Sequence, residues 1–289
     1  MQVTANQLKG SKQIKTSGQA KDSNKTTASK PTIAGRGIQS IETGARLLKV
    51  LVQTARPMML SELAEEAGLP RGQVHAYLVS YRNIGLVEQD PASSLYKLGP
   101  FALHLGLAKL RDFNPLNLAT DAVVAFARDL DLMVSLTIWG THGPTVVRVQ
   151  ETSHVIHANL RVGTVFSLIG TATGRVFAAY MPKQLIDPLI KADIKASAKS
   201  QTGIQRPTLK TVRFELDEIR QKGLACTEDK PVPGLSALSA PIFDFSGQLQ
   251  LVVTIIGPSG IVDVSLDGRH ATALLDFTAN VSSQLGYIP

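Results

Sequence analysis

Two side chains that can recognise DNA bases stand close together in one helical segment. Arg71 can bind a guanine through two hydrogen bonds in the major groove, and Gln73 can bind an adenine in the same way. The outward positions near the start of this segment are Arg71, Gly72, Gln73, His75 and Ala76, and the further DNA-contact candidates are Ser61, Tyr77 and Arg82. A polar helix face alone is usually just solvated, so this interpretation depends on the neighbouring elements.

Three helical segments surround these residues. The first spans residues 38–52, where an apolar stripe at helical spacing contains Ile38, Ile41, Ala45, Leu48 and Val52 and is widened by Leu47 and Leu51. We expect the second to begin at Ser61, with the Ser61 hydroxyl as its cap, and to end at Gly68. The third spans residues 71–83 and follows a Gly-Leu-Pro corner. This pattern predicts a helix-turn-helix whose second helix enters the major groove.

Two short apolar runs, residues 86–89 and 95–98, flank the turn-forming residues 90–94. They predict a β-wing directly after the recognition helix. The winged helix-turn-helix thus spans residues 37–98. Acidic and basic residues nearly balance within it, so we expect DNA affinity to depend on placement and dimerisation rather than on bulk charge.

The N-terminal segment, residues 1–36, holds a net charge of +6 of the chain's formal +7 and has no apolar periodicity. We expect it to be disordered. Two roles remain open for it: a basic arm attracted to DNA phosphates, or a solubilising extension.

The sequence gives little support for a catalytic or metal-binding role. Cys226 is the single cysteine and no base is placed to activate it; His154 and His157 fall on opposite faces of any strand. No Gly-x-Ser-x-Gly or P-loop motif occurs, so we predict no catalytic residue, no metal site and no cofactor. No apolar run is long enough for a membrane span and no cleavable signal is evident, which predicts a cytoplasmic protein without a membrane partner.

The second half of the chain alternates strand pairs with helices. Hairpins are expected at residues 133–139 with 145–150 and at 238–243 with 249–256, and helices at 99–111, 116–130, 171–181, 208–222 and 267–285. This order predicts an α+β sheet covered by helices. The run from Gly170 to Gly174 opens one helix; it is either an anion site at the helix start or an ordinary threonine cap.

The chain resembles the IclR family of bacterial transcription regulators. The resemblance rests on residues 38–42 (IQSIE), 60–70 (LSELAEEAGLP), 85–88 (GLVE), 96–99 (YKLG), 170–175 (GTATGR), 233–234 (PG), 239–244 (SAPIFD) and 284–287 (QLGY). It departs from the family at Gly72, Gln73 and Ala76, where relatives usually carry a hydroxyl pair and an arginine. The operator sequence of relatives therefore cannot be transferred.

The resemblance implies two domains: the winged helix-turn-helix, and a GAF-like effector-binding and oligomerisation domain at residues 115–289, joined by a linker helix at 99–114 that supports dimerisation. It implies operator DNA as partner and a homodimer or a dimer of dimers. Carried over by position, the effector pocket would involve Gly163, Ile169, Gly170, Thr171, Ala172, Thr227, Glu228, Ala237, Ser239, Thr254 and Ile256.

Relatives that bind very small polar acids tend to carry Asp, Cys and Ser at positions matching Thr227, Ala237, Thr254 and Ile256. The more apolar set here favours an aromatic or otherwise larger organic acid. We therefore expect a DNA-binding regulator of a catabolic operon, either repressor or activator. An architectural DNA-binding protein without ligand, and an enzyme fused to a DNA-binding module, are the alternatives.

Overall fold

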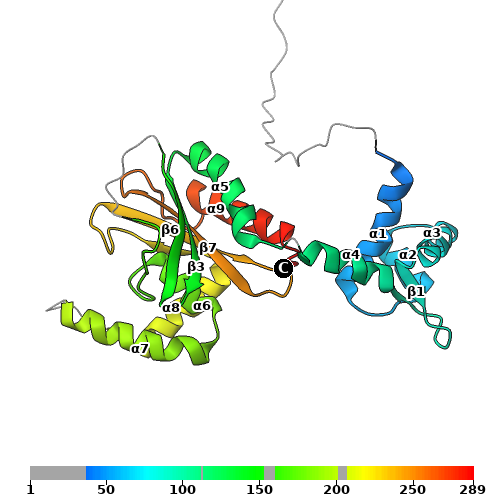
Figure 1. The fold of residues 1–289 in the computed structure, drawn as a ribbon, viewed down its shortest axis with the longest axis horizontal. Helices are drawn as coiled ribbons and strands as arrows, with labels where there is room; N and C mark the ends of the chain where they lie inside the picture. The colour runs from blue at the N-terminus through cyan, green and yellow to red at the C-terminus, as the bar shows by residue number, and fades with distance from the viewer. Residues whose placement is uncertain (1–36, 112, 153–159, 201–206) are drawn as a thin grey trace, which may run out of the picture. The chain divides into compact units, whose positions relative to one another are not determined.

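The computed structural model describes residues 37–111, 113–152, 160–200 and 207–289 (Figure 1). The N-terminal segment, His154 and His157 lie outside these residues, so the expectations about them stay expectations. The chain divides into two compact units, residues 1–104 and 105–289, with the division inside helix α4 (Pro100–Arg111). Each unit has its own hydrophobic core.

The first unit contains three helices and a two-stranded sheet within its described part. They are α1 (Gln39–Thr54), α2 (Leu60–Ala67), α3 (Arg71–Asn83), β1 (Val87–Gln89) and β2 (Tyr96–Leu98). Leu47, Leu63, Val74 and Leu78 are fully buried among these helices. The predicted helix-turn-helix and wing are both present.

Helix α1 buries only one edge of the expected apolar stripe, the edge that contains Leu47 and Leu51. Its buried residues are Gly44, Leu47, Val50 and Leu51, whereas Ile38, Ile41 and Val52 are exposed, Ile41 by 66%. Helices α2 and α3 cover the side of α1 that contains Gly44. A Cβ at Gly44 would collide with the Tyr81 hydroxyl, so glycine lets the tyrosines of α3 approach α1 closely.

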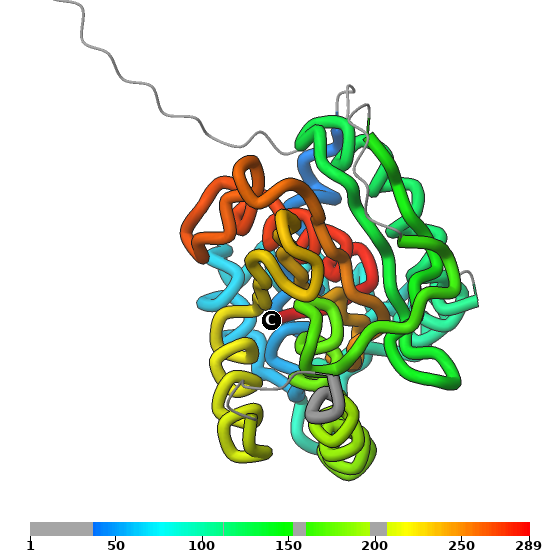
Figure 2. The backbone as a smooth tube through the Cα atoms, turned by 90° about the vertical axis from the view of Figure 1, so that its left-hand side faces the viewer, coloured from blue at the N-terminus to red at the C-terminus, as the bar shows by residue number. Residues whose placement is uncertain are grey.

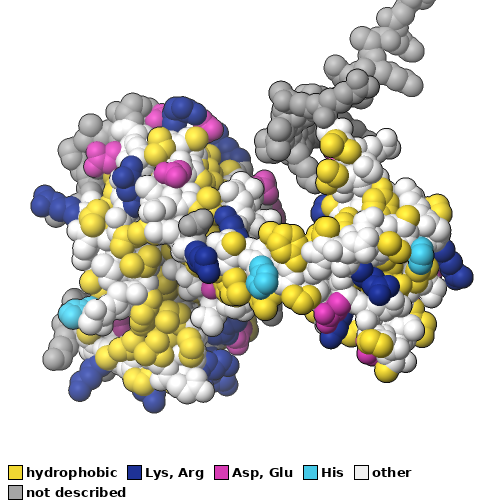
Figure 3. Space-filling model, turned by 45° about the vertical axis from the view of Figure 1, so that its right-hand side comes forward, with side chains coloured by type: hydrophobic (Ala, Val, Ile, Leu, Met, Phe, Trp, Pro, Cys, Tyr) yellow, Lys and Arg dark blue, Asp and Glu magenta, His cyan; other side chains and the backbone are white. Residues whose placement is uncertain are grey.

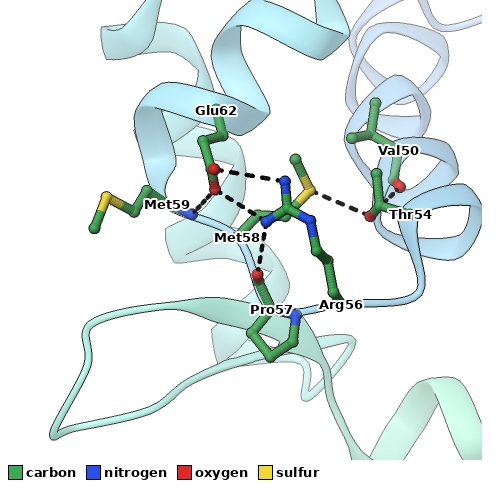
Figure 4. Close-up of polar contacts among 7 residues, drawn as sticks. All are labelled: Val50, Thr54, Arg56, Pro57, Met58, Met59 and Glu62. Atoms are coloured by element: carbon green, nitrogen blue, oxygen red, sulfur yellow. Dashed lines mark hydrogen bonds and ion pairs between the residues drawn. The ribbon is translucent and has the colours of Figure 1, made fainter.

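The start of α2 also differs from expectation. The helix begins at Leu60, and Ser61 lies within its first turn. The capping acceptor is Glu62, whose Oε2 accepts a hydrogen bond from the Met59 amide at 2.9 Å (Figure 4). Arg56 donates to both Glu62 oxygens, and these bonds, the Met59 amide first, lower the pKa of Glu62. The predicted Ser61 cap is therefore wrong: the carboxylate three residues after Met59 reaches back to this amide.

The corner between α2 and α3 forms as the sequence predicts. Gly68 has φ +62°, a left-handed conformation that glycine adopts without strain. The Leu69 amide donates to the Ala64 carbonyl at 2.9 Å, which closes the end of α2. Pro70 then precedes the first turn of α3.

The wing is attached to the helices at its base. β1 and β2 pair antiparallel, with Glu88 opposite Lys97 and their charged groups 3.0 Å apart. Met58 and Tyr96 exchange two backbone hydrogen bonds of 2.9 and 2.8 Å, which join the segment before α2 to the wing. Gly99, directly after β2, lies so close to the Gly85 carbonyl that a Cβ there would collide with it.

The second unit is built on one antiparallel sheet of five strands in the order β4-β3-β7-β6-β5. Its elements are α5 (Pro115–Leu130), β3 (Met133–Gly140), β4 (Gly143–Gln150), α6 (Ala172–Tyr180), α7 (Lys183–Ser200), α8 (Leu209–Lys222), β5 (Ala225–Thr227), β6 (Leu235–Phe243), β7 (Leu249–Pro258) and α9 (Arg269–Gln284). The two predicted hairpins are present, and the pairing of β3 with β7 joins them.

Helices cover both faces of this sheet. α5 and α9 pack on one face, where Val123 and Leu274 contact strand residues such as Val253. α6, α7 and α8 form the other core with Val252, and α7 and α8 lie at the same end of the unit in both views (Figures 1 and 2). The predicted fold class, α+β with two domains and a GAF-like second half, is confirmed.

Two elements of this unit were not predicted. Pro188 lies inside α7 and breaks the helical pattern that would otherwise mark residues 183–200. β5 has three residues, too few for strand alternation to appear in the sequence.

Candidate functional site

One face of α3 presents the predicted DNA-reading residues to solvent. Arg71, Gly72, Gln73, His75 and Ala76 are all exposed, while Val74 and Leu78 on the opposite side have no exposed surface. The helix thus uses its apolar side to fix its position and leaves a cation, an amide and an imidazole free for hydrogen bonding. This combination can contact both phosphates and base edges.

Gly72 has no evident role inside the protein. A Cβ added there would meet nothing within 4 Å, and Gly72 lies in a regular helical turn. A glycine at such a position destabilises a helix by roughly 1 kcal/mol relative to alanine. At the surface it leaves open space where another residue would place a side chain.

The other candidates are held by neighbours. Arg82 donates to the Gln89 side chain at 2.9 Å, and Gln89 donates to the Ser94 carbonyl at 3.0 Å, so α3 is connected to the wing. Tyr77 is half-buried and stacks on Tyr81, with ring centroids 6.3 Å apart. Ser61 is half-buried at the start of α2. Gln89 was not among the predicted residues; its polar side chain in a short strand gave no signal.

The second unit contains a cavity of about 240 Å³ between the start of α6, strands β6 and β7, and the connections that precede α6 and β6. Its lining residues are Leu160, Thr164, Phe166, Thr171, Ala172, Thr173, Thr227, Lys230, Pro231, Val232, Leu235, Ser236, Ala237, Thr254 and Ile256. Six of the predicted pocket residues belong to this wall: Thr171, Ala172, Thr227, Ala237, Thr254 and Ile256.

The remaining predicted pocket residues lie beside the cavity. Ser239 is buried behind Thr254, and Glu228 is exposed next to Thr227. Gly163, with φ +91°, precedes the lining residue Thr164. The amides of Ile169 and Gly170 donate to Asp193 at 3.1 Å and to Ser167 at 2.8 Å, respectively.

Packing accounts for much of the run from Gly170 to Gly174. Thr171 caps α6: its hydroxyl accepts from the Gly174 amide at 3.0 Å and donates to the Ser167 carbonyl at 2.9 Å. A Cβ at Gly174 would collide with that same carbonyl, so the glycine permits the close contact. Asp193 on α7 accepts from the Ser167 hydroxyl at 2.7 Å and thereby holds the loop. The threonine cap, one of the two interpretations drawn from the sequence, is present.

Three buried hydroxyls form a cluster at the inner end of the cavity. Thr254 lies 2.8 Å from Thr173 and 2.8 Å from Ser239, and Thr173 lies 3.4 Å from Ser239 (oxygen to oxygen). Ser239 and Thr254 are opposite each other on β6 and β7, so strand alternation places them on one face. Thr173, from α6, could not be associated with them by sequence.

Lys230 is the single charged residue among the lining residues that the structure describes. Sequence reasoning missed it, together with Leu160, Phe166 and Val232, because these residues lie in connections without periodicity. Within the described ranges, no group of three His, Cys, Asp or Glu side chains could hold a metal ion, and no helix is long and apolar enough to cross a membrane. Cys226 lies half-buried on β5.

Comparisons with known proteins agree with this architecture. Residues 40–91 match the model of the IclR helix-turn-helix domain, and residues 110–283 match that of the bacterial transcriptional regulator IclR C-terminal domain. The glycerol operon regulatory protein of Streptomyces griseus is 31% identical over 264 residues, which cover 87% of this chain and 98% of the relative. The transcriptional repressor IclR of Escherichia coli is 22% identical over 76% of this chain and 80% of its own length.

Among solved structures, that of Pseudomonas aeruginosa HmgR matches with a TM-score of 0.76 and 32% identity, covering 86% of this chain and 99% of HmgR. Both domain models, in the expected order, together span the helix-turn-helix and the sheet unit with its cavity. The chain is therefore a transcriptional regulator and belongs to the IclR family.

Proposed function

We propose that this regulator reads its operator with α3 and that a small organic acid in the cavity of the second unit changes its affinity for DNA. The observation that carries the proposal is the composition of the cavity wall. Among the described residues that line the cavity, apolar side chains and hydroxyls make up nearly all of the wall, Lys230 is the one charged group, and there is no carboxylate. A wall of this kind favours an anion with an apolar body.

The size and polarity of the cavity support an aromatic or otherwise fairly large acid. A volume of about 240 Å³ is ample for a ring or a short chain, and Phe166, Val232 and Ile256 offer apolar contact. A very small polar acid would leave most of this surface without a partner.

Base recognition would come from Arg71 and Gln73, with His75 beside them. All three are exposed on one face of α3, and the structure gives none of them an ion pair among the described residues. The link from Arg82 through Gln89 to Ser94 supports the placement of the wing along the adjacent DNA backbone.

A homodimer, or a pair of such dimers, is the assembly we propose. α4 buries none of its residues, and its exposed apolar side chains are Phe101, Leu103, Leu105, Leu107 and Leu110. Figure 3 shows hydrophobic side chains on the surface of this connecting helix. Exposed leucines at helical spacing favour helix–helix association, and a dimer places two recognition helices on a palindromic site.

Control of a catabolic operon is the biological role we propose. The name of the Streptomyces griseus relative states that it regulates a glycerol operon. An effector produced or consumed by the encoded enzymes would then report the state of the pathway to the promoter.

The test begins with the operator. Genome-wide mapping of sites bound by the full-length protein identifies the sequence, and fluorescence anisotropy with that duplex then measures affinity with and without a panel of aliphatic and aromatic acids. We expect at least one larger acid to change the affinity for DNA. Unchanged affinity with every acid, or a response to a tiny polar acid alone, would contradict the proposed effector class.

A further inference from the structure

Lys230 has an unusual position for an exposed lysine. It lies in the connection between β5 and β6, and it contributes to the wall of the cavity in the second unit. The other lining residues are apolar or carry hydroxyl groups. A charged ligand in the cavity would therefore meet one charged side chain, that of Lys230, among the described residues that line it.

The connection that carries Lys230 is held in place by its neighbours. Asp229 Oδ1 accepts hydrogen bonds from the Gly234 amide at 3.0 Å and from the Ser259 hydroxyl at 2.7 Å. Ser259 in turn accepts from the hydroxyl of Ser236, a buried lining residue, at 2.9 Å. The same Ser259 donates its amide to the Gly234 carbonyl. These bonds tie the segment before β6 to the end of β7, next to the cavity.

The nearest carboxylate in sequence is occupied by this network. Asp229 Oδ1 accepts hydrogen bonds from the Gly234 amide and the Ser259 hydroxyl. No ion pair joins Lys230 to any carboxylate in the described ranges. Glu228 is exposed and does not line the cavity. Among the described residues, no carboxylate forms an ion pair with the ammonium group of Lys230, which can therefore bind an anion that enters the cavity.

We infer that Lys230 binds the carboxylate of the effector at the entrance of the cavity, while the apolar body of the effector lies against Phe166, Val232 and Ile256. The inference rests on the proposed function, which it deepens by assigning the group that selects an acid over a neutral molecule. A lysine suits this role because its ammonium is a compact charge on a flexible chain and donates up to three hydrogen bonds. It can meet the carboxylate where water still solvates both partners, so neither charge must be fully buried.

The test uses the full-length protein and pairs of probes that differ in charge. Benzoate, phenylacetate, 3-phenylpropionate and hexanoate are each titrated calorimetrically beside the corresponding primary amide. We expect the wild type to prefer the best-bound acid over its amide by about tenfold, the size of one charge-assisted hydrogen bond. Lys230→Met should lose this preference by weakening acid binding and leaving amide binding unchanged, and Lys230→Arg should keep it.

Lys191→Met is the matched control, because Lys191 is an exposed lysine of the same unit that does not line the cavity. It should bind every probe as the wild type does. Thermal unfolding of all variants shows whether the fold is retained. Equal binding of acid and amide by the wild type, or an unchanged preference in Lys230→Met, would overturn the role of Lys230 while leaving a ligand-binding cavity. Absence of binding by all eight probes would count against the proposed function itself, and with it the inference.

Discussion

The two units present their chemistry in opposite ways. The DNA-reading candidates of α3 lie within six residues of one another and are exposed, because a buried apolar face on the same helix turns them outwards. The cavity of the second unit is lined by residues from 160 to 256, and its hydroxyl cluster is almost fully buried. A helix face follows from its own periodicity, whereas a cavity exists only after distant segments have packed together.

The largest expected effect comes from removing the exposed DNA-reading side chains of α3. Arg71→Ala and Gln73→Ala should each reduce operator affinity by about 10- to 100-fold, since a bidentate base contact contributes about 1–3 kcal/mol of discrimination. Neither should change the affinity for an acid in the cavity. Anisotropy with the mapped operator and calorimetry with the acid measure the two effects.

Arg46→Ala serves as control for this pair, because Arg46 is exposed on α1 rather than on the outward face of α3. Its loss should reduce affinity much less. If Arg46→Ala weakened binding as strongly as Arg71→Ala, the recognition face would have to be placed elsewhere on the unit.

The buried chemistry can be tested by replacing a hydroxyl with a methyl group. Thr254→Val removes the central member of the hydroxyl cluster and leaves Thr173 and Ser239 with a 3.4 Å contact. We expect the free energy of unfolding to fall by about 1–3 kcal/mol, because buried polar groups lose partners. Urea unfolding of the full-length protein followed by circular dichroism measures the change.

Thr137→Val is the matched substitution on the same sheet. The Thr137 hydroxyl is buried and finds no hydrogen-bond partner among the described residues. Its removal should therefore leave the free energy of unfolding unchanged or raise it. Equal destabilisation by both variants would show that the hydroxyl cluster adds nothing to stability.

Gly72 offers a finer test of this comparison, because it lies on the exposed DNA-reading face of α3 and has open space around it. Gly72→Ala should stabilise the first unit by up to about 1 kcal/mol and still weaken operator binding, because its methyl group projects into open space on the face that would approach the DNA. Gly106→Ala is the control: Gly106 is also helical with open space around it, but it lies in α4. A gain of DNA affinity in Gly72→Ala would mean that the open space at this position has no part in recognition.

The smallest expected effect concerns pH. Burial raises the pKa of Asp244, but hydrogen bonds from Ser246, Gln248 and Gln250 outweigh it and hold this pKa below its ordinary value of 3.8. A lowered pKa in the folded state contributes stability above the unfolded-state value and loses it as the pH falls through the folded-state value. Asp244→Asn should therefore make unfolding less dependent on pH between about 5 and 3. Urea midpoints of the wild type and of Asp244→Asn, measured across this pH range, test the prediction. Parallel curves for the two proteins would contradict it.

Local pattern predicted most of the fold but not its contacts. The bounds of α3, the two wing strands and both hairpins followed from periodicity and turn residues. The buried face of α1 followed only in part, because the stripe was wider than the buried surface and the tyrosines of α3 near Gly44 decide which edge of it is covered. Glu62 rather than Ser61 caps α2, because the helix begins one residue earlier than the sequence predicted.

The cavity shows the same division. Strand alternation places Ala237, Ser239, Thr254 and Ile256 on one face of the sheet, as expected from β6 and β7. Lys230 and Phe166 lie in irregular connections, where no repeat links a residue to the space that it enters. Their positions depend on hydrogen bonds that form only in the folded chain: those of Asp229 hold the connection of Lys230, and the Phe166 amide donates to the Pro144 carbonyl.

The cluster of Thr173, Ser239 and Thr254 has a consequence for how this protein can change over time. Each hydroxyl has one rotatable proton and two lone pairs, so three of them can bond in a ring and reverse its direction together. Such a ring uses all three of its protons internally, so it needs no ligand to satisfy it and offers only its remaining lone pairs, as hydrogen-bond acceptors, to a group that enters the cavity. This part of the cavity therefore favours a group that donates a hydrogen bond over one that only accepts, and a descendant that changed only the other lining residues would keep this preference.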